Sequence, residues 1–567
     1  MRTSPERLIE AYRQQGWWSD RRLFDLFDTA VAATPATLAL VDAPNRSSLA
    51  AGQPLRLSFA DTADLVDRLA FALLTQGLNK GDVLVTQLPN IAEYPALYLA
   101  AMKLGIVISP VPMQFRAHEI GYILELTGAR AMLTVGRFKG EQHASLLQDG
   151  FEARAARLLC LDGEGPAGSE LALPSQLDSN QQQALEAAIA GARVDADDIA
   201  TLCWTSGTEG RPKAVPRSHN HWLSIGDAHL IGVGIREGEK LLSPFPFVNM
   251  AAIGGCLISW LHSRGTLIMH HPLDLPIYLR QIAEERADYA IAPPAVLSML
   301  IRDEALLARA DLSSLRCIGS GSAPLDPAMI RGFQDRFGIE VVNLFGSNEG
   351  ISLISNAANI PDPARRARLF PRYGRSDLQW DVPSPAVIQT RLIDPDDGSE
   401  VMEAGRRGEM QVKGPTVFDG YLHAPEINAR VFTEEGWFRT GDLFELEGEP
   451  GDLRYYRFVG RLGQVINRGG LKISPEEIDS VLAGMASIQE AATTSYPDPV
   501  LGERVCAVVV PKAGQAVTLA DVSAHFHAAG VAVYKHPERV VCIEQLPRNS
   551  TGKVIPAEIA RIATSGD

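Results

Sequence analysis

The stretch Thr205-Ser-Gly-Thr-Glu-Gly-Arg-Pro-Lys213 decides how this chain is interpreted. Residues 199–204 before it are apolar and β-prone, which predicts a buried strand. The loop that follows carries hydroxyl residues, two glycines and the terminal Lys213. Glycines allow backbone N–H groups to turn toward a ligand without a Cβ in the way. The strand, the hydroxyl-rich loop and the lysine together indicate a phosphate-binding loop.

The loop differs from the common nucleotide pattern G-x-x-x-x-G-K-[ST], because Pro212 precedes the lysine and Ala214 follows it. An isolated T-S-G-T segment is equally compatible with a plain turn. The full stretch and its continuation to His219 resemble the phosphate loop of the adenylate-forming superfamily, which contains acyl- and aryl-CoA synthetases, adenylation domains and luciferases. The resemblance assigns nucleotide contacts, and for Thr205 a metal contact, to Thr205, Ser206, Gly207, Thr208, Glu209, Gly210 and Lys213.

Length and charge bound the possibilities. A chain of 567 residues is too long for one core, so we expect a large and a smaller domain. The net charge of −15 argues against a nucleic-acid partner, since phosphate backbones need a basic face. The cysteines show no paired spacing, and the longest apolar run is too short to span a bilayer. We expect a reduced, cytoplasmic enzyme with no integral membrane segment.

The first 200 residues predict an α/β fold. Two amphipathic helical segments flank the aromatic stretch 12–20, which we interpret as a staple beneath those helices. The same stretch resembles the leader of one branch of the superfamily, the aryl-acid ligases and the short-chain, medium-chain and alicyclic acyl-CoA synthetases. Strand-like and helix-like segments then alternate, which predicts mostly parallel sheets. The expected strands are 38–41, 83–87 and 131–134, the expected helices are 60–76 and 91–104, and 140–192 is expected to be surface helix and loop.

Two later segments point to binding surfaces for the acid and the adenine. Residues 242–255 are apolar, broken by prolines and ended by glycines, which by itself is also typical of core. The resemblance implies that they line the acid pocket through Asn249 and Met250, with no cation for a charged substrate tail. In 315–325 a strand leads into a small-residue loop, where Gly319, Gly321 and Ala323 leave room for a flat ring. The resemblance places Gly321, Ser322 and Ala323 at the adenine and Gly319 at the acid.

A third segment, 341–350, carries the predicted metal ligand. Its β run delivers Phe345, a glycine, two polar residues and Glu349. The resemblance implies that Phe345 stacks on adenine and that Glu349 binds Mg²⁺, a hard cation suited to carboxylate oxygen. Asn348 replaces the threonine of the family pattern and still offers a donor, so we assign it a catalytic contact. The remaining nucleotide contacts predicted in this segment are Asn343, Gly346 and Ser347.

Residues near the end of the large domain are predicted to contact the nucleotide and to form a hinge. The resemblance assigns the ribose hydroxyls to Asp442, after a Thr-Gly turn, and a ribose or phosphate contact to Arg461. We place the domain boundary after residue 460. The resemblance makes this loop a hinge, and Gly463 stands where relatives carry Asp or Lys. Glycine keeps the backbone freedom that a hinge needs.

The small domain carries the residue expected to catalyse adenylation. Gly469 and Gly470 allow close approach of a pantetheine arm, and Lys535 joins them in the predicted CoA site. Lys553 follows a Ser-Thr-Gly turn near the end of the chain. An isolated lysine there is nearly always solvated, but its position matches the catalytic lysine of the superfamily.

The expected fold is therefore α/β. A large N-terminal domain (1–460) has mostly parallel sheets flanked by helices and a small β-barrel-like subdomain, and a small mobile α+β domain (461–567) follows. The expected function is an AMP-forming carboxylic acid–CoA ligase that uses ATP, Mg²⁺ and CoA. The acid is expected to be medium-chain, alicyclic, aromatic, or of steroid or terpenoid type. A homodimer is left open.

Three alternatives stay open. A stand-alone aryl-acid adenylation enzyme that loads a carrier protein shares every motif above and differs only in the thiol acceptor. An adenylating oxygenase of the luciferase kind leaves no sequence trace that distinguishes it. A non-catalytic binding module is disfavoured by the presence of Glu349 and Lys553.

Overall fold

The computed structural model describes residues 1–565 except 152–154, 206–211, 309, 323, 383–387, 469–470, 499–500, 530, 532 and 550–551. The chain forms two compact units. The first comprises Met1–Thr390 and Val412–Phe438, and the second comprises Arg391–Gln411 and Arg439–Asp567. The second unit thus begins before the predicted hinge, whose role stays a prediction. None of the described helices is long and apolar enough to cross a membrane.

Sheet I of the first unit has the strand order β6-β5-β3-β4-β7-β8. Its neighbouring strands are parallel except β7 and β8, which are antiparallel. The bounds are β3 (Val83–Gln87), β4 (Val107–Pro110), β5 (Ala131–Thr134), β6 (Arg157–Cys160), β7 (Ile199–Thr205) and β8 (Lys213–Ser218). β3, β4 and β5 are buried along their whole length, as parallel strands covered on both faces should be.

Sheet II has the order β14-β13-β12-β11-β9-β10-β1-β2, with antiparallel strands at its two edges. The strands between them are parallel. The bounds are β1 (Leu38–Val41), β2 (Arg56–Ser58), β9 (Lys240–Ser243), β10 (Thr266–Met269), β11 (Tyr289–Ile291), β12 (Cys317–Gly321), β13 (Glu340–Gly346) and β14 (Ser352–Ser355). The predicted class, α/β with mostly parallel sheets, is confirmed.

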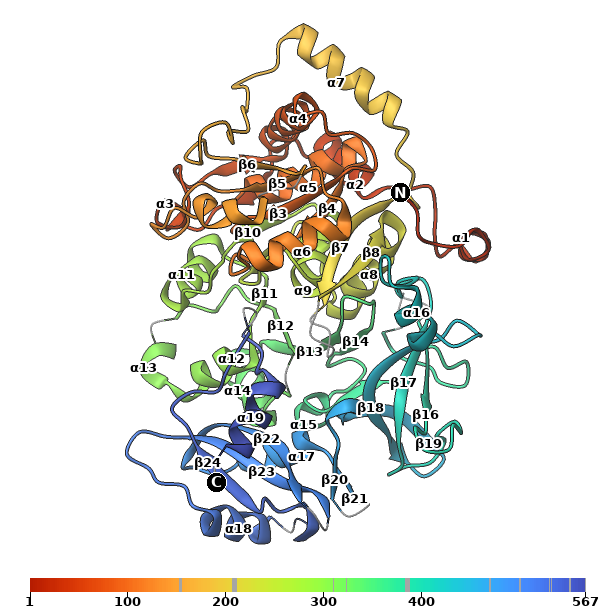
Figure 1. Cartoon of the computed structure of the whole chain (residues 1–567), viewed down its shortest axis with the longest axis vertical. Helices are drawn as coiled ribbons and strands as arrows, with labels where there is room; N and C mark the ends of the chain where they lie inside the picture. Colours follow the sequence, from red (N-terminus) through yellow and green to blue (C-terminus); the bar gives the residue numbers. More distant parts are fainter. Residues whose placement is uncertain are drawn as a thin grey trace. The chain divides into compact units, whose positions relative to one another are not determined.

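Helices connect these strands and cover the sheets (Figure 1). In the first unit they are α1 (Glu6–Gln14), α2 (Leu23–Ala33), α3 (Arg46–Leu49), α4 (Phe59–Thr75), α5 (Glu93–Leu104), α6 (Ala117–Thr127), α7 (Ser179–Ala192), α8 (His219–Val233), α9 (Met250–Ala252), α10 (Ser259–Ser263), α11 (Leu275–Glu285), α12 (Pro294–Arg302), α13 (Glu304–Leu307), α14 (Pro327–Phe337), α15 (Pro363–Arg366) and α16 (Pro425–Val431). The sequence accounts for where these helices begin and for how deeply they are buried. Ser58 caps α4 by accepting from the Asp61 N–H at 3.1 Å. α5 is apolar nearly all round and correspondingly buried.

The predicted elements of the first 140 residues are confirmed, with β1, β3 and β5 at the expected residues. The prediction for 140–192 was incomplete, because β6 lies within that region as a strand of sheet I. The aromatic staple is confirmed. Tyr12, Trp17 and Trp18 cluster with Ile9, and the Trp18 ring lies 5.0 Å from that of His221.

The second unit contains two sheets. Sheet III includes β16 (Gln389–Ile393), β17 (Arg407–Lys413), β18 (Phe438–Glu449) and β19 (Asp452–Arg461), in the order β19-β18-β17-β16. It stands where a small β-barrel-like subdomain was expected, and its described strands follow an open order. Sheet IV has the order β21-β20-β23-β22, and β24 pairs with β23. Its strands are β20 (Ile466–Arg468), β21 (Leu471–Ile473), β22 (Ile488–Asp498), β23 (Gly502–Pro511) and β24 (Arg539–Cys542).

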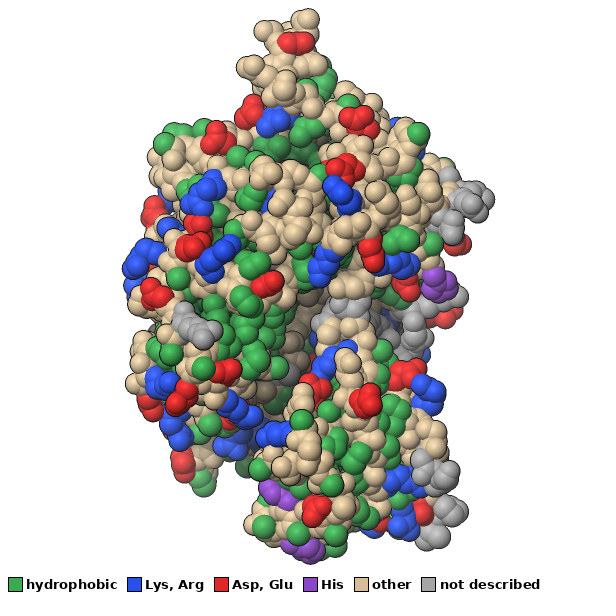
Figure 2. Space-filling model, turned by 90° about the vertical axis from the view of Figure 1, so that its left-hand side faces the viewer, with side chains coloured by type: hydrophobic (Ala, Val, Ile, Leu, Met, Phe, Trp, Pro, Cys, Tyr) green, Lys and Arg blue, Asp and Glu red, His purple; other side chains and the backbone are tan. Residues whose placement is uncertain are grey.

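Helices α17 (Pro475–Leu482), α18 (Leu519–Ala528) and α19 (Pro556–Thr564) complete the second unit. Apolar side chains of sheet IV and these helices form its core, with Val509, Phe526 and Ile559 among the buried residues. On the face shown in Figure 2, acidic and basic side chains are interspersed. The net charge of −15 is therefore not gathered into one field on this face.

Candidate functional site

The phosphate-loop segment begins and ends on adjacent strands. β7 and β8 form a hairpin in which Thr205 lies opposite Lys213. Both ends of the loop are thus held at one edge of sheet I. The predicted contacts Ser206, Gly207, Thr208, Glu209 and Gly210 lie outside the described residues.

Lys213 and Glu349 are joined through an aromatic residue. The Lys213 ammonium lies 4.9 Å from the ring centroid of Tyr421, within the range of a cation–π contact. The Tyr421 hydroxyl donates to Glu349 Oε1 at 2.8 Å. Glu349 is buried, and its carbonyl accepts from the Phe418 N–H at 2.9 Å. The structure therefore brings the predicted phosphate lysine and the predicted metal ligand to one place.

Asn348 connects the end of β7 to the predicted acid segment. Its side-chain amide donates to the Trp204 carbonyl at 2.8 Å, and its Oδ1 accepts from the Met250 N–H at 2.9 Å. We expected this amide to contact phosphate or carboxylate. In the structure the amide binds backbone groups of two other segments, so it fixes how those segments meet. A direct catalytic contact from Asn348 stays a prediction.

A buried arginine, Arg217, binds the backbone of the loop that carries Asn348 and Glu349. The Arg217 Nε donates to the Asn348 carbonyl at 2.9 Å, and its guanidinium also donates to the Thr416 carbonyl. Arg217 is fully buried, and this desolvation lowers its pKa to about 10. The 414–421 segment and the Glu349 loop are thereby tied together.

Gly350 is required by this packing. Its φ is +108°, and a Cβ at this position would lie 1.9 Å from the Thr416 carbonyl oxygen and 2.7 Å from Arg217 Nη2. A side chain there meets both an unfavourable backbone conformation and a steric clash. The residue directly after the predicted metal ligand must therefore be glycine.

Gly350→Ala is expected to destabilise the protein by about 2–5 kcal/mol, because backbone strain and overpacking add. Gly234→Ala is the matched control, since Gly234 also has a positive φ of 68° but open space around its would-be Cβ. The control should lose only about 1–2 kcal/mol. Urea unfolding of both variants measures the difference. Equal losses would show that the Thr416 contact does not constrain the loop.

The predicted adenine loop is packed more tightly than expected. A Cβ on Gly319 would lie 2.3 Å from the Tyr289 hydroxyl, and one on Gly321 would lie 1.9 Å from the Leu344 carbonyl oxygen. We expected these glycines to leave room for a flat ring. The space at both positions is filled by protein atoms, so this reason was wrong, while their placement beside a ligand stays a prediction. Ser322 has a positive φ of 67°, and Ala323 lies outside the described residues.

The side chains in β13 and just after it differ in whether other protein groups already contact them. The Asn343 amide donates to the carbonyls of Arg366 and Ala367, at 3.1 and 2.9 Å. The Phe345 ring lies 5.7 Å from that of Phe370. Beyond Gly346, the Ser347 hydroxyl is buried with no hydrogen-bond partner among the described residues. A buried hydroxyl without a partner is costly, which fits a group that binds a ligand.

The predicted acid segment contains an unusual helix. The Asn249 Oδ1 accepts from the Ala252 N–H at 3.2 Å, and α9 continues directly into a π-helix, η2 (Ile253–Ile258). π-helical turns are frequent at functional sites. Met250 is half-buried. A Cβ added to Gly346 would lie 3.9 Å from the Met250 Cγ. The predicted acid segment and the predicted nucleotide loop are therefore neighbours.

The second unit holds the predicted ribose residues together. Asp442 and Arg461 are opposite each other on β18 and β19, and the Arg461 Nε lies 2.8 Å from Asp442 Oδ1. Asp442 is buried at 3% exposure, and its N–H is 3.0 Å from the Thr440 hydroxyl. The Arg461 contact holds the Asp442 carboxylate in one orientation. The assignment of Asp442 to the ribose hydroxyls and of Arg461 to ribose or phosphate stays a prediction.

The other predicted groups of the second unit occupy turns and surfaces. Gly463 lies in a 3₁₀ turn, η3 (Leu462–Gln464), and a Cβ there meets nothing within 4 Å. The Lys535 ammonium pairs with Glu477 at 2.6 Å, so it carries a partner before any CoA contact. Lys553 is exposed. Gly469 and Gly470 lie outside the described residues.

Comparison with known families decides between an isolated loop match and a whole-chain relationship. A model of the AMP-binding enzymes matches residues 27–422, and a model of the AMP-binding enzyme C-terminal domain matches residues 477–553. The chain belongs to the AMP-binding enzyme family. The predicted relationship to the adenylate-forming superfamily is thereby confirmed.

Individual AMP-binding enzymes resemble the chain along nearly its full length. The medium-chain fatty-acid–CoA ligase of Escherichia coli is 31% identical over 97% of this chain and 92% of the relative. The vibriobactin-specific 2,3-dihydroxybenzoate-AMP ligase of Vibrio cholerae is 28% identical over 97% of this chain and 95% of the relative. The ATP-bound MatB structure from Rhodopseudomonas palustris is 25% identical, with a TM-score of 0.74 over 96% of this chain and 99% of MatB.

This AMP-binding enzyme is an adenylate-forming ligase, and its first unit has chemistry suited to that reaction. The described residues place an ammonium, a carboxylate and an unpartnered hydroxyl on neighbouring loops. These groups meet beside the end of an apolar segment. Phosphate oxygens and a carboxylate substrate are the ligands that such a set recognises.

Sequence reasoning missed Arg217 and Tyr421 as part of this site. Arg217 lies within the continuation of the loop match and was given no role of its own, and Tyr421 was given none. Each acts through residues more than 70 positions away in the chain: the Arg217–Asn348 bond spans 131 positions and the Tyr421–Glu349 bond spans 72. The available signal was weak: an arginine within a β-prone run and a tyrosine after a glycine.

Proposed function

We propose that this enzyme is an ATP-dependent carboxylic acid–CoA ligase. The observation that carries the proposal is the position of Asn348, whose two amide atoms join the end of β7 to the Met250 segment. A nucleotide held at β7 and an acid held by that segment would meet at one point. Such proximity is what the joining of two substrates requires.

In the first half-reaction a carboxylate oxygen attacks the α-phosphorus of ATP. A carboxylate–phosphorus bond forms, the bond to pyrophosphate breaks, and acyl-AMP results. Both reactants are anionic, so the transition state needs positive charge that is already in place. Lys213 and the predicted Lys553 supply such charge. The unpartnered Ser347 hydroxyl supplies a hydrogen-bond donor.

The Glu349 carboxylate fits a magnesium ion. Magnesium is commonly held by one or two carboxylates together with substrate phosphates, so a single buried carboxylate beside a phosphate site suffices. The Tyr421 hydroxyl fixes the orientation of this carboxylate. When bound, the ion would neutralise phosphate charge. Thr205, at the end of β7, is the second residue that we assign to it.

In the second half-reaction the CoA sulfur attacks the acyl carbon. The C–S bond forms, the C–O bond to AMP breaks, and the thiol proton is lost to solvent. We favour CoA because a relative named as a CoA ligase is 31% identical to the chain. The carrier-protein alternative draws on relatives named as aryl-acid adenylating enzymes, such as the 2,3-dihydroxybenzoate-AMP ligase.

The acid is proposed to carry an uncharged tail. Residues 249–258 read Asn-Met-Ala-Ala-Ile-Gly-Gly-Cys-Leu-Ile and contain no cationic side chain. Such a lining favours a medium-chain, alicyclic, aromatic, steroid or terpenoid acid. The medium-chain fatty-acid–CoA ligase among the relatives agrees with the first of these.

The deciding experiment measures acid-dependent pyrophosphate release over fatty, alicyclic, aromatic and steroid acids, with and without CoA. Release that depends on one acid class and rises with CoA, with acyl-CoA detected by mass spectrometry, supports the proposal. Release that ignores CoA and leaves a bound acyl-adenylate supports carrier loading. Absence of release with every acid and both acceptors would contradict the adenylation that the proposal rests on.

Gly463→Pro is expected to spare adenylation and to lower acyl-CoA formation by about tenfold or more, because proline fixes φ and restricts Leu462 before it. Gly463→Ala is the matched control, since a Cβ at this position meets nothing within 4 Å. Each half-reaction is measured separately, by pyrophosphate release and by thioester formation from supplied acyl-adenylate. Unchanged CoA turnover in the proline variant would refute the hinge assignment.

A further inference from the structure

Residues 1–22, which we call the N-terminal arm, contact both strands that hold the phosphate-loop segment. The Met1 carbonyl accepts from the Ile199 N–H at 2.9 Å, where β7 begins. Beyond the end of β8, the Ser19 N–H donates to Asn220 Oδ1 at 3.2 Å, and the Asn220 amide donates to the Ser19 carbonyl at 3.0 Å. The arm therefore fixes the outer ends of this hairpin, on the side away from the loop.

The arm also reaches the 414–421 segment, far away in the sequence and within the same unit. The Ser4 hydroxyl donates to Asp419 Oδ2 across 415 positions of the chain. The Trp18 indole N–H lies 3.4 Å from the Pro415 carbonyl oxygen. Ser4 and Trp18 are buried, and the Asp419 side chain is only 7% exposed. A buried carboxylate needs hydrogen-bond donors, and the arm supplies one of them.

His221 joins the arm, the end of β8 and the 414–421 segment. Its ring lies 5.0 Å from that of Trp18. The His221 Nε2 donates to the Val417 carbonyl at 3.1 Å, while its Nδ1 accepts from the Ser218 N–H at 3.2 Å. The same Nε2 lies 3.4 Å from Asp419 Oδ2. Asp419 thus lies between one partner in the arm and one at the beginning of α8.

Asp419 follows one of the residues that contact Glu349 and precedes another. The Phe418 N–H donates to the Glu349 carbonyl at 2.9 Å, and the Tyr421 hydroxyl donates to Glu349 Oε1 at 2.8 Å. On the far side, the Tyr421 N–H donates to Asn428 Oδ1 at 2.8 Å. The backbone that presents both contacts is therefore anchored on two sides, at Asn428 and at Asp419. A shift of Asp419 would move both contacts to Glu349.

We propose that the N-terminal arm positions the magnesium carboxylate for adenylation, with Ser4 as its principal positioning residue. The Ser4 hydroxyl holds the carboxylate of Asp419. That carboxylate in turn fixes the backbone that presents Phe418 and Tyr421 to Glu349. Because the arm also holds β7 and β8, it keeps the phosphate-loop ends and Glu349 in one arrangement. The inference rests on the proposed function, since it takes Glu349 as the magnesium ligand.

The test measures how much magnesium strengthens ATP binding, by calorimetric titration of the full chain with ATP in the absence of acid and CoA. The ratio of the affinity at saturating magnesium to the affinity in EDTA is the magnesium gain. Ser4→Ala should lower this gain about fivefold or more, because it removes a hydrogen bond to a buried carboxylate. Its affinity in EDTA should match that of the unmodified protein. Ser4→Thr keeps the hydroxyl and should restore most of the gain.

A double-mutant cycle tests whether Ser4 acts through Asp419. Asp419→Asn keeps the shape of the side chain and weakens the same hydrogen bond, so it should also lower the magnesium gain. The loss in the double variant should be smaller than the product of the two single losses, as for residues in contact. Glu125→Gln, at an exposed position of α6, removes a carboxylate elsewhere in the first unit and should leave the gain unchanged. A double-variant loss equal to the product would contradict the proposed route through Asp419.

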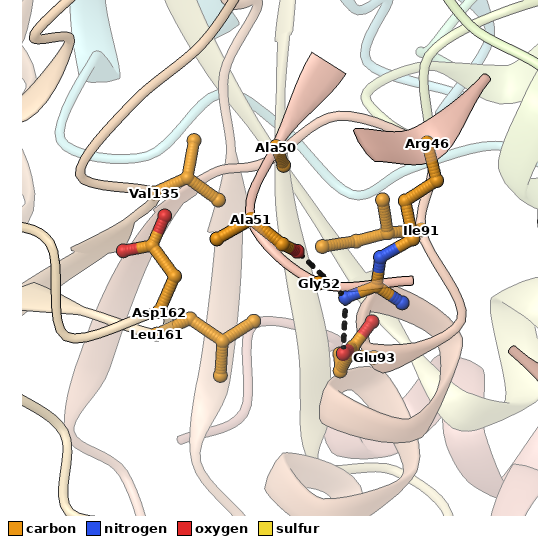
Figure 3. A pocket seen from close by; sticks show the side chains of 9 residues that line it. All are labelled: Arg46, Ala50, Ala51, Gly52, Ile91, Glu93, Val135, Leu161 and Asp162. Carbon is orange, nitrogen blue, oxygen red and sulfur yellow. Dashed lines mark hydrogen bonds and ion pairs between the residues drawn. The ribbon is translucent and has the colours of Figure 1, made fainter. Parts of the chain in front are cut away.

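Val135→Ala separates positioning from general destabilisation. Val135 is buried and lines a cavity of about 210 Å³, whose described lining includes no residue of the arm (Figure 3). The shorter side chain should lower the urea midpoint at least as much as Ser4→Ala does, and it should leave the magnesium gain unchanged. An equal loss of gain in Val135→Ala would reduce Ser4 to a purely structural role. A loss of ATP affinity in EDTA equal to the loss with magnesium in Ser4→Ala would have the same meaning.

Glu349→Gln distinguishes a failure of this inference from a failure of the proposed function. If Glu349→Gln abolishes the magnesium gain and Ser4→Ala retains it in full, the metal assignment stands and the positioning role of Ser4 is wrong. If the unmodified protein shows no gain, or if Glu349→Gln keeps it, Glu349 is not the magnesium ligand. The metal assignment of the proposed function then fails, and this inference fails with it.

Discussion

Lys553→Ala is expected to lower the rate of adenylate formation by at least about a hundredfold, because removal of one preorganised group at the developing charge commonly costs that much or more. Thioester formation from a supplied acyl-adenylate should stay within about threefold, because the anionic phosphate chain has already departed in that step. The contrast between the two half-reactions is the measured result. It separates a residue used in one step from a residue that the whole fold needs.

Lys553→Ala leaves the backbone of its turn intact. The Lys553 side chain is exposed, while its backbone is held in a turn by Asn549. The Lys553 N–H donates to Asn549 Oδ1 at 2.9 Å, and the Asn549 N–H donates to the Lys553 carbonyl at 2.8 Å. Alanine keeps both backbone bonds. We therefore expect a change in unfolding free energy within about 0.5 kcal/mol.

Lys512→Ala is the matched control, an exposed lysine of the same unit. It should leave both half-reactions unchanged. If Lys553→Ala slowed both half-reactions equally, the lysine would not be specific to adenylation. If it slowed neither, the assignment of this residue as the catalytic lysine would be wrong.

The parallel sheets were predictable because their strands carry a local signal. Residues 83–87 and 131–134 are short β-prone runs, and burial on both faces selects such runs. β6 was missed because Arg157-Leu-Leu-Cys160 lies in a region, 140–192, that is rich in Ala, Gln, Gly and Glu and is typical of surface helix and loop. Its strand character comes from pairing with β5, which a local pattern cannot reveal.

The site was predictable where residues follow one another in the chain and not where they meet through the fold. The β7 strand and Glu349 were found from contiguous motifs. Tyr421 and Arg217 contact the Glu349 loop from distant segments, so no spacing in the sequence announces them. Gly319 and Gly321 were found for the wrong reason, because the atoms that require glycine there belong to Tyr289 and Leu344.

Glu349→Gln is expected to lower adenylate formation by about a hundredfold or more at low magnesium, because it removes the negative charge that suits a hard cation. Glutamine has the same shape, and its Oε1 can still accept from the Tyr421 hydroxyl. Fold and Tyr421 position should therefore be retained, and the unfolding midpoint should match that of the unmodified protein. The substitution thus tests the charge of Glu349 and leaves its packing alone.

The magnesium dependence distinguishes this role from a general one. Raising the magnesium concentration should restore part of the rate in Glu349→Gln, since a weaker site still fills at higher concentration. Glu125→Gln, the exposed control, should show the magnesium dependence of the unmodified enzyme. A variant with reduced rate but an unchanged magnesium midpoint would mean that Glu349 acts on the loop and not on the metal. In that case Tyr421→Phe, which breaks the 2.8 Å hydrogen bond to Glu349, should reproduce the defect.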